Sequence, residues 1–416
     1  MRNAKFFPVF VLLVAVLLLS AGITIARSQG AEPVQQGSSD FELRAETVNA
    51  ALAQNNLFDC ATYYPDLGSV LPVDHQIFQI VRDVKITPDD GREYMGAVWS
   101  PDGNAMVLVV PTDGYRDILD SDALPSDDET RLVAISRNEL MLYFPNQNVW
   151  DQITSDGARP TWSTDAQSIY YMMGTDLMKF DLNTRTAIYA GLRAPYTAVG
   201  LLFSRPLPDG RLLAPRQPHA PLEIQGGKTP ALSPIEVADS DHIVLSPWSD
   251  QVVVGYGANT FGGHFVPAVT VLHHPNGEIT PLLKNCHFSA IEMVWSPTGK
   301  QIAYPTNTDI PEIRIYDVES GQTRVLVRLD TGDLLSGLSW SPDGKFLAFT
   351  QGDDRSTPRS IWVVSTNGAM RQRLTEGGLL PNWSPDGRHI LYARPSADRL
   401  LDWYLLEYTA VEAEGG

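Results

Sequence analysis

The sequence predicts an all-β protein: a β-propeller of seven four-stranded blades, with six blades as the alternative. Two observations lead to this fold class. A short phrase recurs seven times at intervals mostly in the forties, and strand-like segments follow each copy. Self-similarity at that period is typical of propellers, solenoids and arrays. No long amphipathic helical pattern follows the N-terminal region, so an all-helical solenoid is not favoured.

The recurring phrase is Trp-Ser-Pro-Asp-Gly, complete or altered. Five clear copies begin at Trp99, Trp162, Trp295, Trp340 and Trp383. Two worn copies begin at Phe203 and Leu245, and the spacings between first residues are 63, 41, 42, 50, 45 and 43. Proline presets its own backbone angle, aspartate can bond to its own backbone, and glycine accepts a positive φ. The phrase therefore predicts a tight turn between two strands.

We expect the repeat residues to be scaffold, because a fold by itself does not specify a function. The tryptophan rings should pack between neighbouring blades, where they bury a large area, and the aspartates should lock the turns. The residues expected in this structural role are Trp99, Asp102, Trp162, Asp165, Asp209, Asp250, Trp295, Trp340, Asp343, Trp383 and Asp386. No residue is predicted to be catalytic, to bind a cofactor or to bind a metal.

The two ends of the repeat region predict how the ring closes. The last phrase is followed by only two strand-like segments, His389–Arg394 and Asp402–Thr409, so its blade lacks an outermost strand. A strand-like segment at Gln76–Val84 precedes the first phrase and has no blade of its own. We expect it to pair with the tail of the chain, which completes the seventh blade and removes an exposed sheet edge.

The chain divides into three parts. Residues 1–26 form a signal peptide or an N-terminal membrane anchor, because Phe6–Ala26 carries no charge and spans about 31 Å as a helix. Residues 27–75 form a tether and capping segment, with a short helix expected at Phe41–Asn55, and residues 76–416 form the propeller. Everything after the first part is expected outside the cytoplasm, periplasmic or secreted or tethered, with membrane contact only through the N-terminal segment.

The chain has two cysteines, Cys60 and Cys286. In an oxidising compartment such a pair suggests one disulfide, which would fasten the capping segment to the propeller. Two separate buried thiols are the alternative, since sequence does not show that the sulfurs meet.

Charge and missing motifs narrow the function. The formal net charge is −18, which argues against nucleic acid as a partner because phosphate contacts need a basic surface. The chain has no Gly-x-Ser-x-Gly elbow, no glycine-rich phosphate loop and no His-x-His or Cys-x-x-Cys pattern. We therefore expect a monomer that binds a protein or a glycan, with no cofactor.

Three features keep alternatives open. The segment Thr112–Thr130 inserts seven acidic residues into the first blade, and it is read as a solvated loop with calcium as the alternative. The eight histidines are scattered, and a metal site would need several blades to bring them together. Four arginines of the third repeat form either a solvated rim or a pocket for an acidic group: Arg193, Arg205, Arg211 and Arg216.

The phrase and its spacing resemble the WD-repeat-like propellers of TolB and of prolyl-oligopeptidase-type enzymes. The resemblance covers about Gln76 to Thr409, and it implies a propeller that holds a partner on one face or at the mouth of its channel. The sequence departs from TolB in showing no separate N-terminal α/β domain. It departs from the oligopeptidases because the chain ends where a hydrolase domain would begin.

Taken together, the sequence predicts an extracytoplasmic, non-catalytic propeller that binds or scaffolds a protein or glycan partner. One alternative is a metal-assisted propeller enzyme, such as a polysaccharide lyase or a lactonase. Another is the sensor domain of an envelope system.

Overall fold

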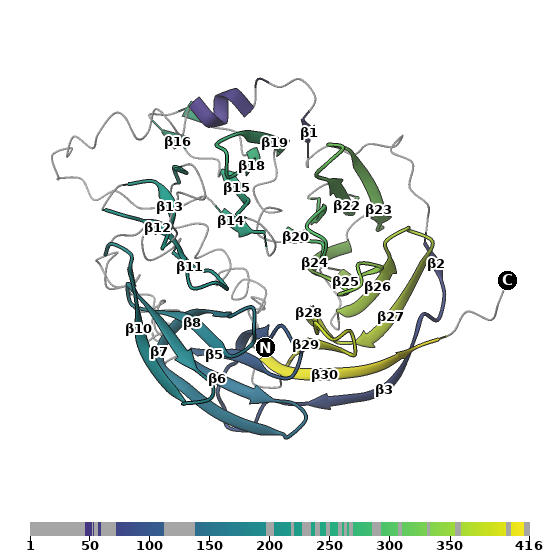
Figure 1. The fold of residues 1–416 in the computed structure, drawn as a ribbon. Coiled ribbons are helices and arrows are strands. Elements are labelled where there is room, and N and C mark those ends of the chain that lie inside the picture. Colours follow the sequence, from purple (N-terminus) through teal and green to yellow (C-terminus); the bar gives the residue numbers. More distant parts are fainter. Residues whose placement is uncertain are drawn as a thin grey trace, which may run out of the picture.

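The computed structural model of the chain describes strands arranged around a common centre (Figure 1). The described residues are 46–51, 53, 57–59, 72–111, 138–196, 204–217, 220–226, 234–237, 242–246, 250–256, 260–261, 264–265, 269–284, 293–306, 310–330, 333–353, 359–396 and 401–411. The N-terminal segment 1–26, the acidic insertion 112–130 and both cysteines lie outside them. We number the repeat units one to seven, in the order of the seven phrases.

Units one and two share a seven-stranded sheet in the order β10-β9-β8-β7-β6-β5-β4. Its strands are β4 (Met95–Trp99), β5 (Met106–Pro111), β6 (Asn138–Phe144), β7 (Val149–Trp162), β8 (Ser168–Met173), β9 (Asp176–Asp181) and β10 (Thr186–Arg193). The first half of β7 pairs with β6 and the second half with β8. This long strand is therefore the outer strand of unit one and the inner strand of unit two.

Units three and four have separate sheets. The strands of unit three are β11 (Arg205–Pro206), β12 (Leu212–Pro215) and β13 (Leu222–Gln225). The strands of unit four are β14 (His242–Leu245), β15 (Val252–Tyr256), β18 (Val269–His273) and β19 (Ile279–Lys284), and the early strand β1 (Phe58–Asp59) joins β19 in parallel. A two-stranded hairpin, β16 (Thr260–Phe261) and β17 (His264–Phe265), lies between β15 and β18 in the chain.

Units five to seven are the most regular. Unit five contains β20 (Val294–Trp295), β21 (Gln301–Pro305), β22 (Glu312–Asp317) and β23 (Thr323–Arg328). Unit six contains β24 (Asp333–Trp340), β25 (Phe346–Asp353), β26 (Ser360–Ser365) and β27 (Met370–Glu376), with the early strand β2 (Val73–Asp74) at its edge. Unit seven contains β28 (Leu379–Trp383), β29 (His389–Pro395), β30 (Leu401–Ala410) and β3 (Phe78–Lys85).

The early strand β3 pairs with β30, as the sequence predicted. The two strands are antiparallel, and their register runs from Phe78 opposite Ala410 to Lys85 opposite Tyr404. In Figure 1, β3 lies alongside the long last strand at the outer edge of unit seven. The all-β, propeller-like fold is confirmed, whereas the count of seven blades and the complete closure of the ring stay predictions.

Apolar residues of neighbouring units pack together and hold the sheets in place. In one cluster, Ile313 and Ile315 of unit five meet Leu347 and Phe349 of unit six, all of them buried. The repeat tryptophans reinforce these contacts through hydrogen bonds. The indole Nε1 of Trp162 donates to the Val98 carbonyl at 3.0 Å, and that of Trp340 donates to the Val294 carbonyl at 3.1 Å. In both cases the ring ties its own unit to the preceding one.

Unit three requires a correction to the repeat alignment. The amide of Gly210 donates to the Leu207 carbonyl at 3.0 Å, the same bond that Gly103 makes to Ser100 at 2.9 Å in the first copy. Leu207 therefore stands in the serine position, and Pro206 rather than Phe203 stands in the tryptophan position. The alignment on Phe203 was wrong because it left a gap before the Pro-Asp-Gly turn, and that turn fixes the two residues before it.

The capping segment contacts units three and four. A short helix occupies residues 46–51, inside the predicted range Phe41–Asn55. Its Val48 and Ala51 are fully buried in the cluster that contains Leu213 and Val254. Further along, Asp59 of β1 lies opposite Lys284 of β19. Cys60 and Cys286 lie outside the described residues, so the disulfide between them stays a prediction.

Candidate functional site

A cleft of about 400 Å³ opens between unit seven and unit one, and we call it the seam cleft. The early strand β3, the last strands β29 and β30 and the turn between β6 and β7 all contribute to it. The lining residues are Arg82, Val84, Lys85, Ile86, Tyr143, Pro145, Asn146, Asn148, Arg388, His389, Leu405 and Glu407. The site is therefore built where the two ends of the repeat region meet.

Three ionisable residues form a row across one wall of the cleft. Glu407 of β30 lies directly opposite His389 of β29 on one side and opposite Arg82 of β3 on the other. The register of β3 shifts between Ile80 and Arg82, with Val81 as the extra residue. A shift of one residue turns a side chain to the other face of a sheet. The bulge at Val81 thus places Arg82 on the same face as Glu407.

The other wall comes from the turn between β6 and β7 in unit one. Asn148 has a positive φ of 54°, and its Oδ1 accepts a hydrogen bond from the Tyr143 hydroxyl at 3.1 Å. Burial raises the pKa of Tyr143, while the positive charge of Arg82 acts in the opposite direction. The phenol is therefore neutral at ordinary pH and lies within reach of the Arg82 charge. The exposed amides of Asn146 and Asn148 add donors and acceptors.

The seam cleft is locally cationic within an acidic protein. Three of its residues are cations (Arg82, Lys85 and Arg388) and one is a carboxylate (Glu407). Lys85 already forms ion pairs with Asp89 and, at 3.0 Å, with Asp402. The hydrogen bond to Asp89, followed by the one to Asp402, raises the pKa of Lys85. Among the described residues, the guanidinium groups of Arg82 and Arg388 make no ion pair. Both side chains are exposed, and they remain available to a ligand.

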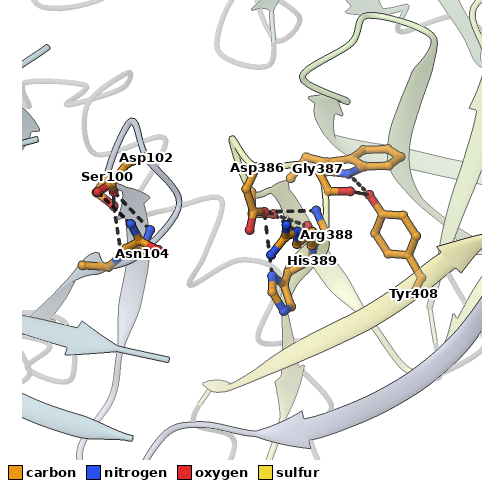
Figure 2. Close-up of polar contacts among 11 residues, drawn as sticks. Ser100, Asp102, Asn104, Asp386, Gly387, Arg388, His389 and Tyr408 are labelled. Atoms are coloured by element: carbon orange, nitrogen blue, oxygen red, sulfur yellow. Dashed lines mark hydrogen bonds and ion pairs between the residues drawn. The ribbon is translucent and has the colours of Figure 1, made fainter. Parts of the chain in front are cut away.

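The turn of the seventh phrase positions Arg388 and His389 (Figure 2). Asp386 Oδ1 accepts hydrogen bonds from Ser384 Oγ at 2.6 Å and from the Arg388 amide at 3.0 Å, and it lies 3.8 Å from His389 Nδ1. The Tyr408 hydroxyl donates to the Gly387 carbonyl at 2.6 Å. These bonds fix the backbone on both sides of the two cleft residues.

The first-phrase turn packs against the seventh at this seam, as Figure 2 shows for Ser100, Asp102 and Asn104 beside Asp386. Gly103 has a φ of +72°, and a Cβ built on it would lie 3.0 Å from the Asp386 Cβ. Glycine is therefore needed here for both its backbone conformation and its small size. The two turns can approach only because the phrase ends in glycine.

The repeat aspartates bond within their own turns. Asp102, Asp165, Asp343 and Asp386 each accept the hydroxyl of the phrase serine at 2.6 Å. Burial acts to raise the pKa of Asp102, but hydrogen bonds from Ser100 and Asn104 outweigh it and lower the pKa. Asp209 accepts the Arg211 amide at 3.1 Å in the same manner.

Asp250 differs from the other repeat aspartates. The Ser246 amide donates to the Gln251 carbonyl, as Ser100 does to Ala105, so Asp250 occupies the place that Asn104 has in the first copy. Its two oxygens accept from Arg211 Nη2 at 2.6 Å and Nη1 at 3.0 Å. Asp250 therefore links unit four to unit three through Arg211. The sequence instead predicted that it locks the turn of its own copy.

The arginine cluster predicted in the third repeat does not form one site. Arg193 pairs with Asp176, Arg211 with Asp209 and Asp250, and Arg216 with Glu223. These ion pairs are distributed over units two to four and engage three of the four arginines. Nη1 of Arg205, the fourth, donates to the Ser204 carbonyl at 3.0 Å.

Histidines do not converge in the described part of the chain. His273 bonds to the Tyr256 hydroxyl, His274 lies between Gln251 and Thr280, and His389 lines the seam cleft. Within the described ranges, no three residues of the types His, Cys, Asp and Glu gather closely enough to hold a metal ion. In the same ranges, no helix has the length and apolar character needed to cross a membrane.

Sequence reasoning missed Arg82, Arg388 and the amides of the seam cleft. Arg82 belongs to the early strand that the sequence paired with the tail, and Arg388 follows the seventh phrase directly. The two positions become neighbours only through the pairing of β3 with β30. The predicted closure was the available signal, but the facing turn of unit one carries no motif.

Comparisons with known proteins support the fold and leave the function open. No protein-family model matches the chain. An uncharacterized protein of Agrobacterium fabrum, Atu1656, is 31% identical over 124 residues, which is 29% of this chain and 41% of that protein. The chain thus matches about two fifths of the length of this relative.

Solved structures give a broader likeness. An oligogalacturonate lyase in complex with manganese aligns with a TM-score of 0.55 at 16% identity, over 82% of this chain and 97% of that one. The β-propeller domain of the Trilobed protease from Pyrococcus furiosus aligns with a TM-score of 0.51 at 12% identity, over 78% and 99%. TolB from Acinetobacter baumannii aligns with a TM-score of only 0.38 at 14% identity, over 77% and 63%. At these identities the likeness shows a propeller fold alone.

Proposed function

We propose that the protein is a non-catalytic binding propeller outside the cytoplasm, and that its seam cleft binds a carboxylated sugar unit of an acidic glycan. One observation carries the proposal: Arg82 and Arg388, two exposed guanidinium groups, line a cationic cleft in a chain of net charge −18. Location outside the cytoplasm is part of the proposal and rests on the apolar run Phe6–Ala26.

The chemistry of the cleft suits such a ligand. A guanidinium group binds a carboxylate through two parallel hydrogen bonds. The exposed Asn146 and Asn148 amides supply both donors and acceptors, which sugar hydroxyls require. A volume of about 400 Å³ lies within the usual size of small-ligand sites. A small acidic unit of a longer chain therefore fits, with its neighbours extending into solvent.

Calorimetric titration with galacturonate, and with galactose as its neutral match, tests the proposal. The wild-type protein should bind galacturonate and not galactose, with affinity falling as salt rises because the attraction is electrostatic. The double variant R82Q/R388Q should lose at least about tenfold in affinity, since charge-assisted hydrogen bonds are worth roughly 1.5–3 kcal/mol each. The variant R373Q, at an exposed arginine paired with Glu376 on β27, should bind as wild type.

Equal binding of galacturonate by wild type and R82Q/R388Q would contradict the cleft assignment. Binding of an acidic peptide in place of the sugar would replace the glycan by a protein partner. Oligogalacturonate is the substrate named for a structural neighbour, so the same samples should be followed for formation of an unsaturated sugar product. Turnover would overturn the non-catalytic assignment in favour of a lyase.

A further inference from the structure

Glu407 is the only carboxylate among the described residues that line the seam cleft, and it is half-buried on β30. Within the described ranges, its carboxylate forms no ion pair and accepts no hydrogen bond, although Arg82 and Arg388 line the same cleft. The binding of a ligand carboxylate by these arginines does not use Glu407. Its negative charge even opposes that binding, so the presence of Glu407 in the cleft needs a separate explanation.

The two other carboxylates on β3, β29 and β30 both have cationic partners. Asp83 of β3 accepts from Arg394 at 2.7 Å, and Asp402 of β30 lies 3.0 Å from Lys85. Polar groups that are shielded from water generally have hydrogen-bond partners, because a charged group that loses hydration without compensation is destabilised. Glu407 therefore lacks the kind of donor that the protein provides for its neighbours.

The strand register places Glu407 between two other residues of the cleft. It lies directly opposite Arg82 of β3 and directly opposite His389 of β29. Residues directly opposite each other on neighbouring strands project from the same face of a sheet, and the strands lie about 5 Å apart. A ligand carboxylate bound by Arg82 therefore lies about one strand spacing from Glu407. The rest of a sugar ring covers that distance and brings its hydroxyl groups to Glu407.

We propose that the Glu407 carboxylate accepts hydrogen bonds from ring hydroxyl groups of the ligand, and so makes the seam cleft select hydroxylated ring carboxylates over carboxylates without hydroxyl groups. An ionised carboxylate has two oxygens that only accept hydrogen bonds, whereas each sugar hydroxyl has one hydrogen to donate. Bonds to a charged acceptor are about twice as strong as bonds between neutral groups. This role of Glu407 depends on the function proposed above, since the same ligand occupies the same cleft.

The charge and the hydrogen bonds of Glu407 have separable effects on binding. Its charge repels the carboxylate of every acidic ligand, with or without hydroxyl groups. Its hydrogen bonds favour only the ligand that has hydroxyl groups to donate. The ratio of two dissociation constants, one for each kind of ligand, therefore reports the hydrogen bonds and cancels the repulsion.

Calorimetric titration with galacturonate and with cyclohexanecarboxylate, which has a ring and no hydroxyl groups, measures this ratio. The wild-type protein should bind galacturonate at least about tenfold more tightly than cyclohexanecarboxylate. E407Q keeps the shape of the side chain and should lower this preference at least about fivefold, because the remaining acceptor is neutral. E407A removes the acceptor and should lower the preference further. Thermal unfolding of both variants verifies that they fold.

Glu376 supplies the matched control. It is an exposed carboxylate on β27 that pairs with Arg373 outside the cleft, so E376Q removes the same charge and should leave the preference unchanged. The proposal is overturned if wild type binds the two ligands equally, if E407Q and E407A keep the wild-type preference, or if E376Q lowers it to the same extent. Failure of the wild-type protein to bind either ligand would instead overturn the function proposed above, and the role of Glu407 with it.

Discussion

At the scale of single residues, His273 couples the stability of unit four to pH. It is buried on β18, and its Nε2 lies 2.9 Å from the Tyr256 hydroxyl. Burial, followed by the nearby His274, lowers the pKa of His273 to about 4, from 6.5 in an exposed histidine. Between these two pH values, His273 is mostly neutral in the folded protein and mostly protonated in the unfolded chain.

The sign of the effect follows from this pKa. Between pH 6.5 and about 4 the unfolded state binds more protons, so the free energy of unfolding decreases as the pH falls through this range. The full loss from this histidine amounts to about 3 kcal/mol. Chemical unfolding of wild type and H273Q at pH 7 and pH 5 should show a smaller pH dependence in the variant. The exposed His75 provides the control H75Q, and an unchanged pH dependence in H273Q would contradict the assignment.

The residue scale also shows what the phrase predicted well. Serine, proline, aspartate and glycine together specify a turn by local chemistry, and in the described turns the aspartate accepts a backbone amide two residues further on. The hydrogen bond that it also accepts from the phrase serine was not part of the expectation. The worn copies were harder to place because local chemistry was incomplete. Phe203 was aligned in place of Pro206, and Asp250 has an ion-pairing role that depends on Arg211 in another unit.

At the scale of elements, β3 is held to unit seven by more than its pairing with β30. Both oxygens of Asp83 accept from the Tyr392 hydroxyl, at 2.7 and 2.8 Å, and Oδ2 also accepts from Arg394 at 2.7 Å. Tyr392 is fully buried on β29, two strands away from β3. A carboxylate on the edge strand thus satisfies a buried hydroxyl in the interior of the sheet.

We expect D83A to destabilise the protein by about 2 kcal/mol, because the buried Tyr392 hydroxyl loses its acceptor. Denaturant titration measures this change. The control D74A removes an exposed partner of Arg371 on β2 and should cost less than about 0.5 kcal/mol. Similar losses in the two variants would mean that Asp83 does not hold the strand.

The β-bulges within the strands could not be predicted from the sequence. Strand positions could be predicted from alternating apolar residues, because half-buried strands require that period. A register shift depends on how two strands meet, and the shift at Val81 places Arg82 on the same face as Glu407 in the seam cleft. The one available signal was glycine three residues before Trp99 and Trp340, which marks the positive φ that Arg159 adopts under strain.

At the scale of the whole molecule, the order of the strands makes the seam a natural place for a site. The first described repeat strand and the last one belong to neighbouring units, so the seam joins residues more than three hundred positions apart, such as Tyr94 and Trp403, whose indole donates to the Tyr94 carbonyl. Sequence could predict this meeting from the unpaired ends. It could not predict the cationic character of the cleft, because Arg82, Arg388 and Tyr143 come from three separate segments.

The measurement that tests the account most directly compares the full chain with a shorter chain from which residues 78–85 are deleted. The two chains differ only in β3. The full chain should be a monomer that binds galacturonate, whereas the shorter chain should lose binding and aggregate through the exposed edge of β30. If the shorter chain is monomeric, equally resistant to heat and still binds galacturonate, β3 neither completes unit seven nor builds the seam cleft.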